Sequence, residues 1–540
     1  MTPVPGNVAV QLSDSGPRAS TRALSDLGGI AARAVDTPDV VALTDGTVTM
    51  TWREVAAAVT AAGGRLQEAT RRSPRSRVGV CSENTVHTLI VHAAGLATGV
   101  GTVALSRHGS AREVRQQVED TACHTVVAGP SGIEALRVAR EEGLSLGQVV
   151  VQGHSARGDE MGWDEWLRAE PAARDVEPAR PANPPLVFTS GTTGRARATQ
   201  VRWVAEAGRL SSHQFLCQVA ARSGFPPGPH LVVGPLQHNG PLTSLRHLMA
   251  GQPVVILPKF DGAAALRLIE HHGVSSTVMV PTHFTRLLAL QTSVRGQYSV
   301  SSLQMVAHTG SACPASVKRE MISWFGSVLV ESYGGSELGT VCRIDSSEWL
   351  DHPGSVGRAV PPLGVEAYDD GLRPLARGST GLLGISVPEG QGPDYVGDVE
   401  KTRQAYLRPG LATLGDVGHV DDDGYVFITD RSSDMVVSGG VNLYPAEVEQ
   451  VLTRHPHVRE VAVIGVPDPD MGEALKALVV ADFATPRADE LDAFCRRELT
   501  PYKCPRSYEF VESLPRNEMG KLDKRALRRP FWDGPRTIAG

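Results

Sequence analysis

The feature that most constrains the fold of this chain is a repeated alternation of short apolar runs with helix-like patterns. "SRVGVCSEN" (76–84) is typical of a strand and turn, "TVHTLIVHAAGLATGV" (85–100) of a helix, and "TVVAG" (125–129) of another strand. The alternation returns later, with "GQPVVILP" (251–258) and "GSVLVESYGG" (326–335). Because such alternation is typical of α/β proteins with a largely parallel sheet, we predict two successive α/β units.

The pattern changes at Leu382, where shorter strands separated by Gly and Pro turns predict a small β-barrel. Another unit begins beyond residue 431, with Pro445 at a helix start and a strand over 461–466. We therefore predict a large N-terminal domain of two α/β subdomains plus the barrel, followed by a small α+β C-terminal domain. The predicted bounds are 1–431 for the N-terminal domain, 432–434 for a hinge and 435–540 for the C-terminal domain.

Length, charge and cysteine usage exclude several classes of protein. The 540 residues are too many for one ordinary core, and a formal net charge of -6 lacks the basic footprint of nucleic-acid binders. No segment approaches the run of about 20 apolar residues that spans a bilayer, and the first residues lack signal-peptide regions, so we expect a cytoplasmic protein. The seven scattered cysteines contain no CxxC pair, which predicts reduced thiols and a packing role for Cys313.

A loop of glycines and hydroxyls follows the strand "LVFTS". Backbone N–H groups and hydroxyls in such a turn can converge on phosphate oxygens, because glycine permits close approach. Taken alone, a short Gly/Thr string is more often a polar surface turn, so its function depends on the other motifs of the chain. The loop comprises Thr189, Ser190, Gly191, Thr192, Thr193 and Gly194.

The loop is joined by "YGGSE" (333–337), "GDVG" (415–418), "DRSSDMVVSGGVNLYPAEVE" (430–449) and "PRNEMGK" (515–521). In this order, the five motifs resemble the core motifs of the adenylate-forming superfamily of acyl-CoA synthetases, peptide-synthetase adenylation domains and luciferases. Each motif alone is weak, but five in the same order are specific. The resemblance implies an enzyme that joins a carboxylate to the α-phosphate of ATP, releases pyrophosphate, and passes the acyl group to the thiol of CoA.

The resemblance also assigns the nucleotide and magnesium contacts. The 189–194 loop would hold the β- and γ-phosphates, and Arg197 stands where the family usually has lysine, which keeps the cation. Glu337 would bind Mg²⁺, since one or two carboxylates with phosphates suit that ion, and Asp416 would accept the ribose hydroxyls. The remaining expected nucleotide or CoA contacts are Gly310, Ser311, Tyr333 stacked on adenine, Gly334, Ser336, Ile428, Arg431, Gly439 and Gly440.

Three further positions carry catalytic or hinge roles in the family. Lys521 would bridge the substrate carboxylate and the α-phosphate, although a lysine in such a loop is by itself usually a surface charge. His238 matches a gate beside the acyl pocket, and a structural histidine is an equally good interpretation. Ser433 stands at the hinge where the family usually has Asp or Lys, which puts an efficient thioester step in doubt.

The acidic run "DDDG" (421–424) is better explained as a solvated hairpin turn than as a metal site.

The acid is predicted from the residues around the acyl pocket. Residues 234–237 contain no aspartate to pair with an ammonium group, so we expect an acid without an α-amino group. "PLQHNGP" and "EWLDHPGSVGR" resemble segments of synthetases for bile-acid, sterol-side-chain or other alicyclic acids, which favours a bulky apolar acid. The expected pocket walls are Val280, Thr282, Phe284, Ala307, His308, Gly335 and Leu338.

Other functions stay open at this point. The same adenylation chemistry could load a carrier protein or partner enzyme instead of CoA; we expect CoA, because no carrier domain is recognised within these 540 residues. A catalytically inactive adenylate-binding scaffold is disfavoured by the presence of Lys521, Glu337 and Asp416, and nothing calls for a luciferase-type oxygenase. We expect a homodimer if the protein is oligomeric.

Overall fold

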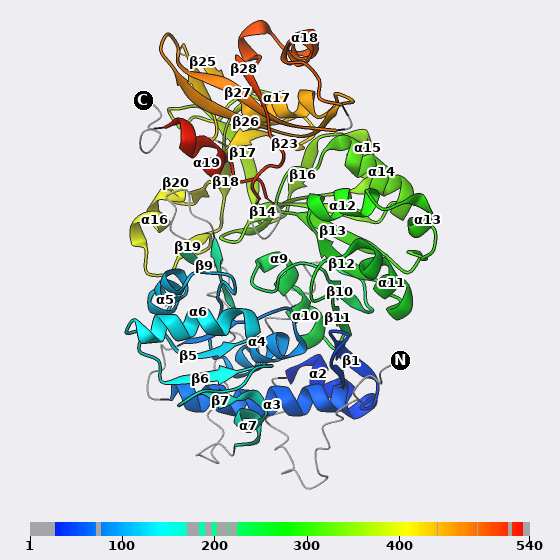
Figure 1. The fold of residues 1–540 in the computed structure, drawn as a ribbon, viewed down its shortest axis with the longest axis vertical. Coiled ribbons are helices and arrows are strands. Elements are labelled where there is room, and N and C mark those ends of the chain that lie inside the picture. The colour runs from blue at the N-terminus through cyan, green and yellow to red at the C-terminus, as the bar shows by residue number, and fades with distance from the viewer. Residues whose placement is uncertain are drawn as a thin grey trace.

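The computed structural model describes residues 27–71, 77–169, 183–189, 197–201, 214, 224–431, 433–439, 441–482, 484–516 and 521–532. The molecule is elongated, with two α/β units side by side, an antiparallel region beyond them and the C-terminal unit at the far end (Figure 1). The fold is thus mixed α/β with a separate small C-terminal unit, as predicted from the alternation. None of the helices in the described ranges combines the length and apolar character needed to cross a membrane.

The first α/β unit is built on an eight-stranded sheet whose central strands are parallel. Helix α4 (Val86–Thr98) is apolar on nearly every side and is buried, and the hydroxyl of Thr85, the residue before it, caps the helix. The strands run in the order β19 (Pro393–Tyr395), β9 (Arg197–Val201), β8 (Leu186–Thr189), β4 (Thr102–Ala104), β3 (Arg77–Cys81), β5 (Cys123–Ala128), β6 (Gln148–Val151), β7 (Met161–Gly162). The accompanying helices are α3 (Trp52–Thr70), α5 (Ala111–Asp120), α6 (Pro130–Glu141) and α7 (Trp163–Arg168).

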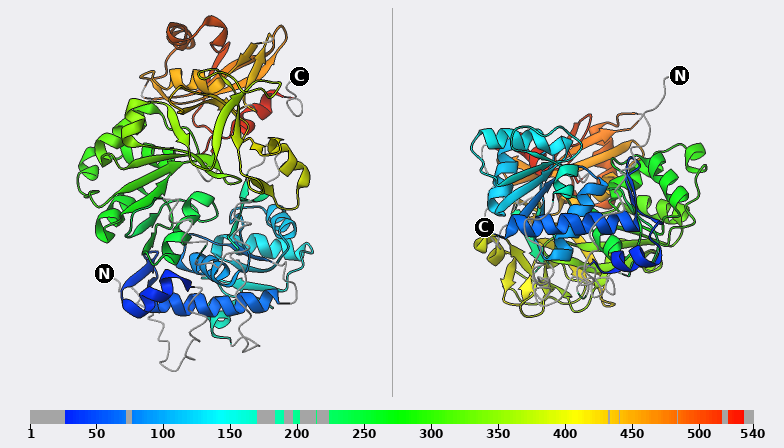
Figure 2. Two further views of the ribbon diagram at one scale, coloured as in Figure 1. Left: turned by 180° about the vertical axis from the view of Figure 1, so that it is seen from behind. Right: turned by 90° about the horizontal axis from the view of Figure 1, so that it is seen from below.

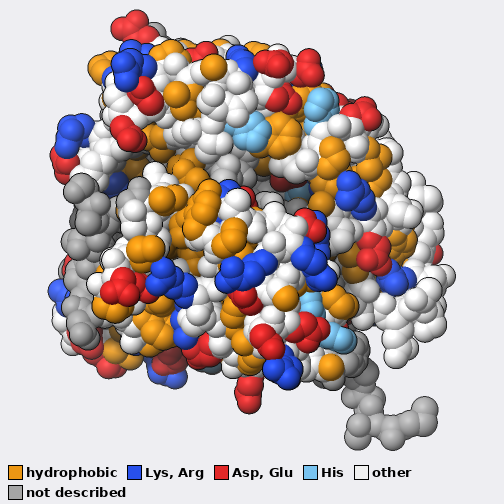
Figure 3. Space-filling view, turned by 90° about the horizontal axis from the view of Figure 1, so that it is seen from above, with side chains coloured by type: hydrophobic (Ala, Val, Ile, Leu, Met, Phe, Trp, Pro, Cys, Tyr) orange, Lys and Arg blue, Asp and Glu red, His pale blue; other side chains and the backbone are white. Residues whose placement is uncertain are grey.

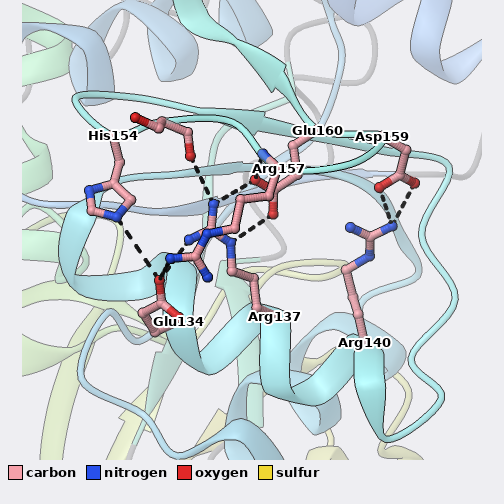
Figure 4. A network of polar contacts seen from close by, with 8 residues as sticks. Glu134, Arg137, Arg140, His154, Arg157, Asp159 and Glu160 are labelled. Atoms are coloured by element: carbon pink, nitrogen blue, oxygen red, sulfur yellow. Dashed lines mark hydrogen bonds and ion pairs between the residues drawn. The ribbon is translucent and has the colours of Figure 1, made fainter.

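A network of ion pairs holds the loop after β6 against α6 (Figure 4). The guanidinium of Arg137 donates to both carboxylate oxygens of Glu160, at 2.9 and 2.6 Å, and to Glu134 at 2.6 Å. Arg140 donates to Asp159 in the same loop. The loop acids Glu160 and Asp159 are thus paired with arginines of α6, so the network is structural.

The second unit contains the parallel half of a 15-stranded sheet, in the order β1, β11, β10, β12, β13, β14. Parallel strands place their carboxyl ends at one edge of the sheet, where ligands commonly bind. The strands are β1 (Val41–Thr44), β2 (Thr49–Thr51), β10 (His230–Val232), β11 (Val254–Ile256), β12 (Ser276–Met279), β13 (Met305–Thr309) and β14 (Leu329–Gly335). The helices are α2 (Gly29–Asp36), α9 (Asn239–Leu242), α10 (Ser244–Met249), α11 (Gly262–His272), α12 (Pro281–Leu288), α13 (Thr292–Arg295) and α14 (Ala315–Phe325).

The same sheet then becomes antiparallel. The change occurs at β15, well before Leu382, because a tight turn at Gly339 (φ 73°) folds the chain back on β14. As predicted, "DDDG" forms the turn between two antiparallel strands, β22 and β23. This region holds β15 (Gly339–Asp345), α15 (Ser346–Asp351), β16 (Ser355–Ala359), β17 (Gly364–Tyr368), β18 (Gly381–Ser386), α16 (Val399–Gln404), β20 (Tyr406–Arg408), β21 (Leu411–Ala412), β22 (Asp416–Val420) and β23 (Val426–Arg431).

The C-terminal unit has its own five-stranded sheet and its own apolar core, which includes Val436, Leu452 and Val463. Figure 2 shows it at one end of the molecule, next to the antiparallel region. Its first helix starts at Pro445, as predicted, because proline suits the first helical position. The elements are β24 (Val436–Ser438), β25 (Val441–Leu443), α17 (Pro445–Leu452), β26 (Val458–Asp468), β27 (Gly472–Ala481), α18 (Ala488–Glu498), η3 (Pro501–Lys503), β28 (Ser507–Phe510), α19 (Lys524–Arg528) and η4 (Arg529–Phe531).

Candidate active site

Several of the motif residues meet beyond the carboxyl ends of β12, β13 and β14. Gly310 follows β13, while Tyr333 and the hairpin turn with Ser336 and Glu337 end β14. The antiparallel β22–β23 pair sets Asp416 opposite Arg431. The arrangement brings together residues that lie far apart in the sequence.

Asp416 is 4% exposed and has a partner on each oxygen. The Tyr333 hydroxyl donates to Oδ2 at 2.6 Å, and the Arg431 Nε lies 3.2 Å from Oδ1. Burial raises the pKa of Asp416, and Arg431 opposes this effect. Burial and the neighbouring Asp416 also raise the pKa of Tyr333, so the phenol stays protonated and can donate. Tyr333 therefore holds the acid as well as offering a ring.

Glu337 is held by an aromatic residue from another part of the chain. The Tyr395 hydroxyl, at the end of β19, donates to Glu337 Oε1 at 2.9 Å. An added Cβ on Gly335 would lie 2.8 Å from Glu337 Oε2, so a side chain there would displace this carboxylate. The described residues contain no group of three or more His, Cys, Asp or Glu that could bind a metal unaided. One carboxylate is nevertheless the donor set that Mg²⁺ uses when phosphate oxygens supply the rest.

Lys521 extends from the C-terminal tail to the end of β13. Gly310 has a φ of +95°, and a Cβ built there would lie 3.2 Å from Cε of Lys521 and 3.8 Å from its Nζ. The positive φ favours glycine at this position, and an added Cβ would crowd the lysine. Burial and Arg431 lower the pKa of Lys521, while Glu337 and Asp416 oppose this. Carboxylates and cations of the site therefore act on this ammonium group.

His238 lies directly before α9 and faces the same region. Asn84, after β3, receives the backbone N–H of Leu236 and donates to the carbonyl of Gly234, each at 2.8 Å, which fixes this segment. Burial lowers the pKa of His238 to about 4, and Lys521 and Arg107 add to the effect. Its buried Nε2 has no hydrogen-bond partner among the described residues. His238 is therefore a neutral imidazole beside the lysine.

The predicted pocket walls divide between two faces of the sheet. Val280 and Gly310 lie against each other, and Val278 and Thr309 face α9, so this side of β12 and β13 borders the site. Thr282 is half-buried at the start of α12, and Ala307 is buried on β13 next to Thr309.

For Phe284, His308 and Leu338 the structure differs from the prediction that they line the acyl pocket. The ring of His308 packs edge-on against Phe284 at 5.2 Å, and its Nε2 lies 3.7 Å from Glu331, on the face covered by α12 and α14. Alternate residues of a strand point to opposite faces, so His308 turns away from the face shared by Ala307 and Thr309. Leu338 packs into the core of the antiparallel region. These three are core residues.

The phosphate loop falls mostly outside the described residues, which include Thr189 but not 190–194. The Thr189 hydroxyl donates to the carbonyl of Arg197 at 3.4 Å across the β8–β9 pair. The Arg197 Nε lies 2.7 Å from Asp398, and its Nη1 lies 3.4 Å from Asp120. Two carboxylates thus hold the guanidinium of Arg197, and its expected phosphate contact stays a prediction.

The predicted hinge is clasped by the last helix. Arg528 of α19 pairs with Asp434 at 2.8 Å and donates to the carbonyl of Ser433 at 3.3 Å. On the other side, the backbone N–H of Ala446 donates to Asp430 at 2.8 Å. These contacts fix the present orientation of the C-terminal unit relative to β23.

Gly439 lines a hollow of about 620 Å³ in the C-terminal unit, and Gly440 lies outside the described residues. Figure 3 views this end of the molecule and shows apolar and charged side chains intermixed on it. Of the other predicted contacts, Ser311 is exposed, Gly334 and Ser336 are half-buried at the hairpin, and Ile428 packs on the antiparallel core. Cys313 has its pKa raised to about 12 by burial, which agrees with a packing role.

Sequence reasoning missed three residues of the site. Tyr395 reaches Glu337, Arg107 lies beside His238, and Lys401 lies over the ring of Tyr395 with its Nζ 4.3 Å from the centroid. Tyr395 and Arg107 lie far in the sequence from the residues they approach. None of the three belongs to the five family motifs. The only signal was the Gly-Pro turn before Tyr395 in "QGPDYVGD".

Two family models match the chain. The model described as AMP-binding enzyme matches residues 30–390, and the model described as AMP-binding enzyme C-terminal domain matches residues 447–521. Together they cover most of the chain and end at Lys521.

Curated and solved proteins match along nearly the whole chain. A (7a-methyl-1,5-dioxo-octahydro-1H-inden-4-yl)propanoyl:CoA ligase of Rhodococcus jostii is 32% identical, with 91% of this chain and 95% of that protein covered. The 2-succinylbenzoate–CoA ligase of Bacillus pumilus is 30% identical, with 92% and 96% covered. The amide bond synthetase McbA from Marinactinospora thermotolerans has a similar structure, with a TM-score of 0.79, 28% identity, and 94% and 100% covered.

Proposed function

The chain belongs to the AMP-binding enzyme family, and from this membership we propose that it is an acid–thiol ligase that activates a carboxylic acid with ATP. The acid is joined to AMP with release of pyrophosphate, and the acyl group then passes to the thiol of CoA. The observation that carries the proposal is the meeting of Lys521 from the C-terminal tail with Gly310, Glu337 and Asp416 of the large domain. Two CoA ligases at 30% identity or more support it.

In the first step, the substrate carboxylate attacks the α-phosphate and the electron pair of the broken P–O bond leaves with pyrophosphate. Two anions must approach each other, so alignment and charge neutralisation are the main catalytic tasks. We assign the bridging of carboxylate and α-phosphate to the Lys521 ammonium group. Neutral His238 beside it adds no competing charge and keeps a ring nitrogen available to the incoming acid.

In this proposal, Asp416 contacts the ribose of the nucleotide and Glu337 acts at its phosphates. Asp416, held by Tyr333 and Arg431, accepts hydrogen bonds from the ribose hydroxyls. Glu337 would hold Mg²⁺, which supplies charge neutralisation to the phosphate oxygens when bound. The Tyr395 hydroxyl donates to Oε1 and so orients the carboxylate that would hold the ion.

We propose that the acid is bulky, apolar and free of an α-amino group. The Rhodococcus relative is named for a propanoyl group on a fused two-ring skeleton, and the Bacillus relative for a substituted benzoate. The buried apolar residues Val280 and Ala307 on the face toward α9 are consistent with such a group. No carboxylate stands in 234–237 to pair with an ammonium.

Pyrophosphate exchange tests the first step. Linear, aromatic and polycyclic acids are offered singly with ATP and labelled pyrophosphate, and we expect exchange to be fastest with a polycyclic acid. Exchange confined to linear acids would reject the proposed substrate class. Absence of exchange with every acid, in a protein that binds ATP, would support an adenylate-binding scaffold instead.

The acceptor is tested separately. CoA, a phosphopantetheinyl carrier protein and a simple amine are compared with the best acid, and we expect the CoA thioester to form fastest. An amine acceptor is the second candidate, because the amide bond synthetase McbA covers 94% of this chain at 28% identity. Faster amide than thioester formation would favour it.

A further inference from the structure

One aromatic ring at the edge of the site holds both an acid and a cation. The Tyr395 hydroxyl donates to Glu337 Oε1 at 2.9 Å, and the Lys401 Nζ lies over the ring, 4.3 Å from its centroid. Tyr395 is 8% exposed, so its ring is a fixed platform. A lysine ammonium over an aromatic face is attracted to the ring electrons without spending its hydrogen-bond donors. Lys401 is therefore placed beside the acid assigned to magnesium.

Short contacts fix Lys401 at this point. The Asp398 carboxylate caps α16 by accepting the backbone N–H of Lys401 at 3.0 Å, and Arg197 pairs with the same carboxylate at 2.7 Å. The hydroxyl of Thr402, the next residue, accepts the backbone N–H of Tyr395 at 2.9 Å. Because Arg197 is the first described residue after the glycine-rich segment, α16 is tied to the strand that leaves that segment.

The Lys401 ammonium group forms no ion pair with the described residues. Within the ranges that the structure describes, no carboxylate oxygen comes within 4.0 Å of its Nζ, whereas Arg197 is paired with two acids. Glu337 and Asp398 act on Lys401 from a greater distance and oppose the lowering of its pKa by burial. A half-buried ammonium with unused donors next to a metal-binding carboxylate suits an anion that arrives together with the metal.

We propose that Lys401 contacts the β- and γ-phosphates of ATP and follows them as pyrophosphate leaves, with Tyr395 as the positioning residue for both Lys401 and Glu337. The proposal rests on the proposed function, which brings a triphosphate to Glu337. Lys401 transfers no proton in this step. It neutralises charge while the bond between the α-phosphorus and the bridging oxygen breaks and its electron pair leaves with pyrophosphate.

Binding of ATP and AMP to the full chain tests the contact without the reaction. Lys401→Met removes the charge, Lys401→Arg keeps it, and Arg403→Met is the matched control. Arg403 lies on the same helix but pairs at the surface with Glu400. Loss of a charged hydrogen bond predicts an ATP affinity reduced about tenfold or more in Lys401→Met, with AMP affinity unchanged. Lys401→Arg and Arg403→Met should bind ATP within about threefold of wild type. Unchanged ATP affinity in Lys401→Met, or an equal loss for AMP, overturns the contact.

Two further measurements separate this inference from the proposed function. In pyrophosphate exchange, Lys401→Met should raise the KM for pyrophosphate, while transfer of a supplied acyl adenylate to CoA stays unchanged; an unchanged KM overturns the inference alone. A wild type that binds ATP but exchanges with no acid overturns the proposed function and leaves the binding test valid.

Tyr395→Phe keeps the ring under Lys401 but removes the hydrogen bond to Glu337, so ATP binding should require more Mg²⁺. An unchanged Mg²⁺ dependence contradicts the positioning role.

Discussion

Lys318 and Lys521 are both lysines withdrawn from solvent, and their surroundings differ in kind. Lys318 of α14 is 0% exposed, donates to Glu331 at 2.5 Å and lies 4.6 Å from the ring centroid of Trp349. Lys521 lies where Gly310 leaves room for it, among Glu337, Asp416 and Arg431. Burial lowers the pKa of both, but the next largest effect is a raising by Glu331 for Lys318 and a further lowering by Arg431 for Lys521. A lysine matched to one acid stabilises the fold, whereas a lysine among charges of both signs is suited to an incoming anion.

The largest expected effect is a loss of folding stability when Lys318 is replaced. Lys318→Met leaves Glu331 buried without its cation, and we expect a loss of about 3–5 kcal/mol in the free energy of unfolding. Urea titration measures it. The double variant Lys318→Met with Glu331→Leu should recover most of the loss, because an apolar pair of similar volume replaces the ion pair. A single-variant loss below about 1 kcal/mol would mean that the pair is not a structural element.

The second effect should fall on activity alone. Lys521→Met removes the donor assigned to the α-phosphate, and we expect pyrophosphate exchange to fall by about 10²–10³, equivalent to about 2.7–4 kcal/mol. Unfolding free energy should stay close to wild type, and a supplied acyl adenylate should still react with CoA. Lys503→Met, which removes a surface partner of Glu447, is the control. Equal loss of both half-reactions would contradict the role assigned to Lys521.

A smaller effect comes from His308, which shares Glu331 with Lys318. Burial and Lys318 hold its pKa well below the usual value in the folded protein. The unfolded chain therefore takes up the proton first, and stability is lost as pH falls through about 6.5. Between about pH 7.5 and about pH 5.5 this histidine should cost about 1.4 kcal/mol. Urea titrations of wild type and His308→Leu at both pH values check it: the variant should lose that much less, and parallel losses would show that His308 is protonated in the fold.

The smallest expected effect concerns the hinge. Ser433→Asp adds a second acid next to Asp434, which already pairs with Arg528. Ser433 is exposed, and an added charge at an exposed position contributes less than about 1 kcal/mol, so we expect a change of a few-fold at most. The change should appear in thioester formation and not in pyrophosphate exchange. Stopped-flow measurement of the two steps distinguishes them, and equal changes would argue against a hinge at this position.

Local features of the sequence predicted much of the fold. The strands predicted within 76–84 and at 125–129 correspond to β3 (77–81) and β5 (123–128). The helix start at Pro445 and the hairpin at "DDDG" were also predicted, because apolar period, proline geometry and turn residues act over a few positions. The start of the antiparallel region was predicted too late, since the turn at Gly339 lies inside the "YGGSE" hairpin and carries no strand signal of its own.

The site was only partly predictable for a related reason. Short motifs indicated Tyr333, Glu337, Asp416 and Lys521, and the structure brings these together. The face of β13 to which His308 points depends on which helices cover the sheet, which sequence spacing does not reveal. Tyr395 reaches Glu337 across 58 residues, and no local pattern announces such a contact. Tertiary packing decided these positions.

The clasp between Arg528 and Asp434 predicts that the reaction rate depends on ionic strength. The rotation of the C-terminal unit about Ser433 that we propose would loosen the contact of Arg528 to the Ser433 carbonyl, next to this ion pair. The two side chains are 16% and 18% exposed, so dissolved ions screen the pair only in part; added salt should ease the rotation slightly while it weakens capture of the triphosphate. Reaction rate would then pass through a maximum as salt rises, with domain release limiting on one side and substrate capture on the other.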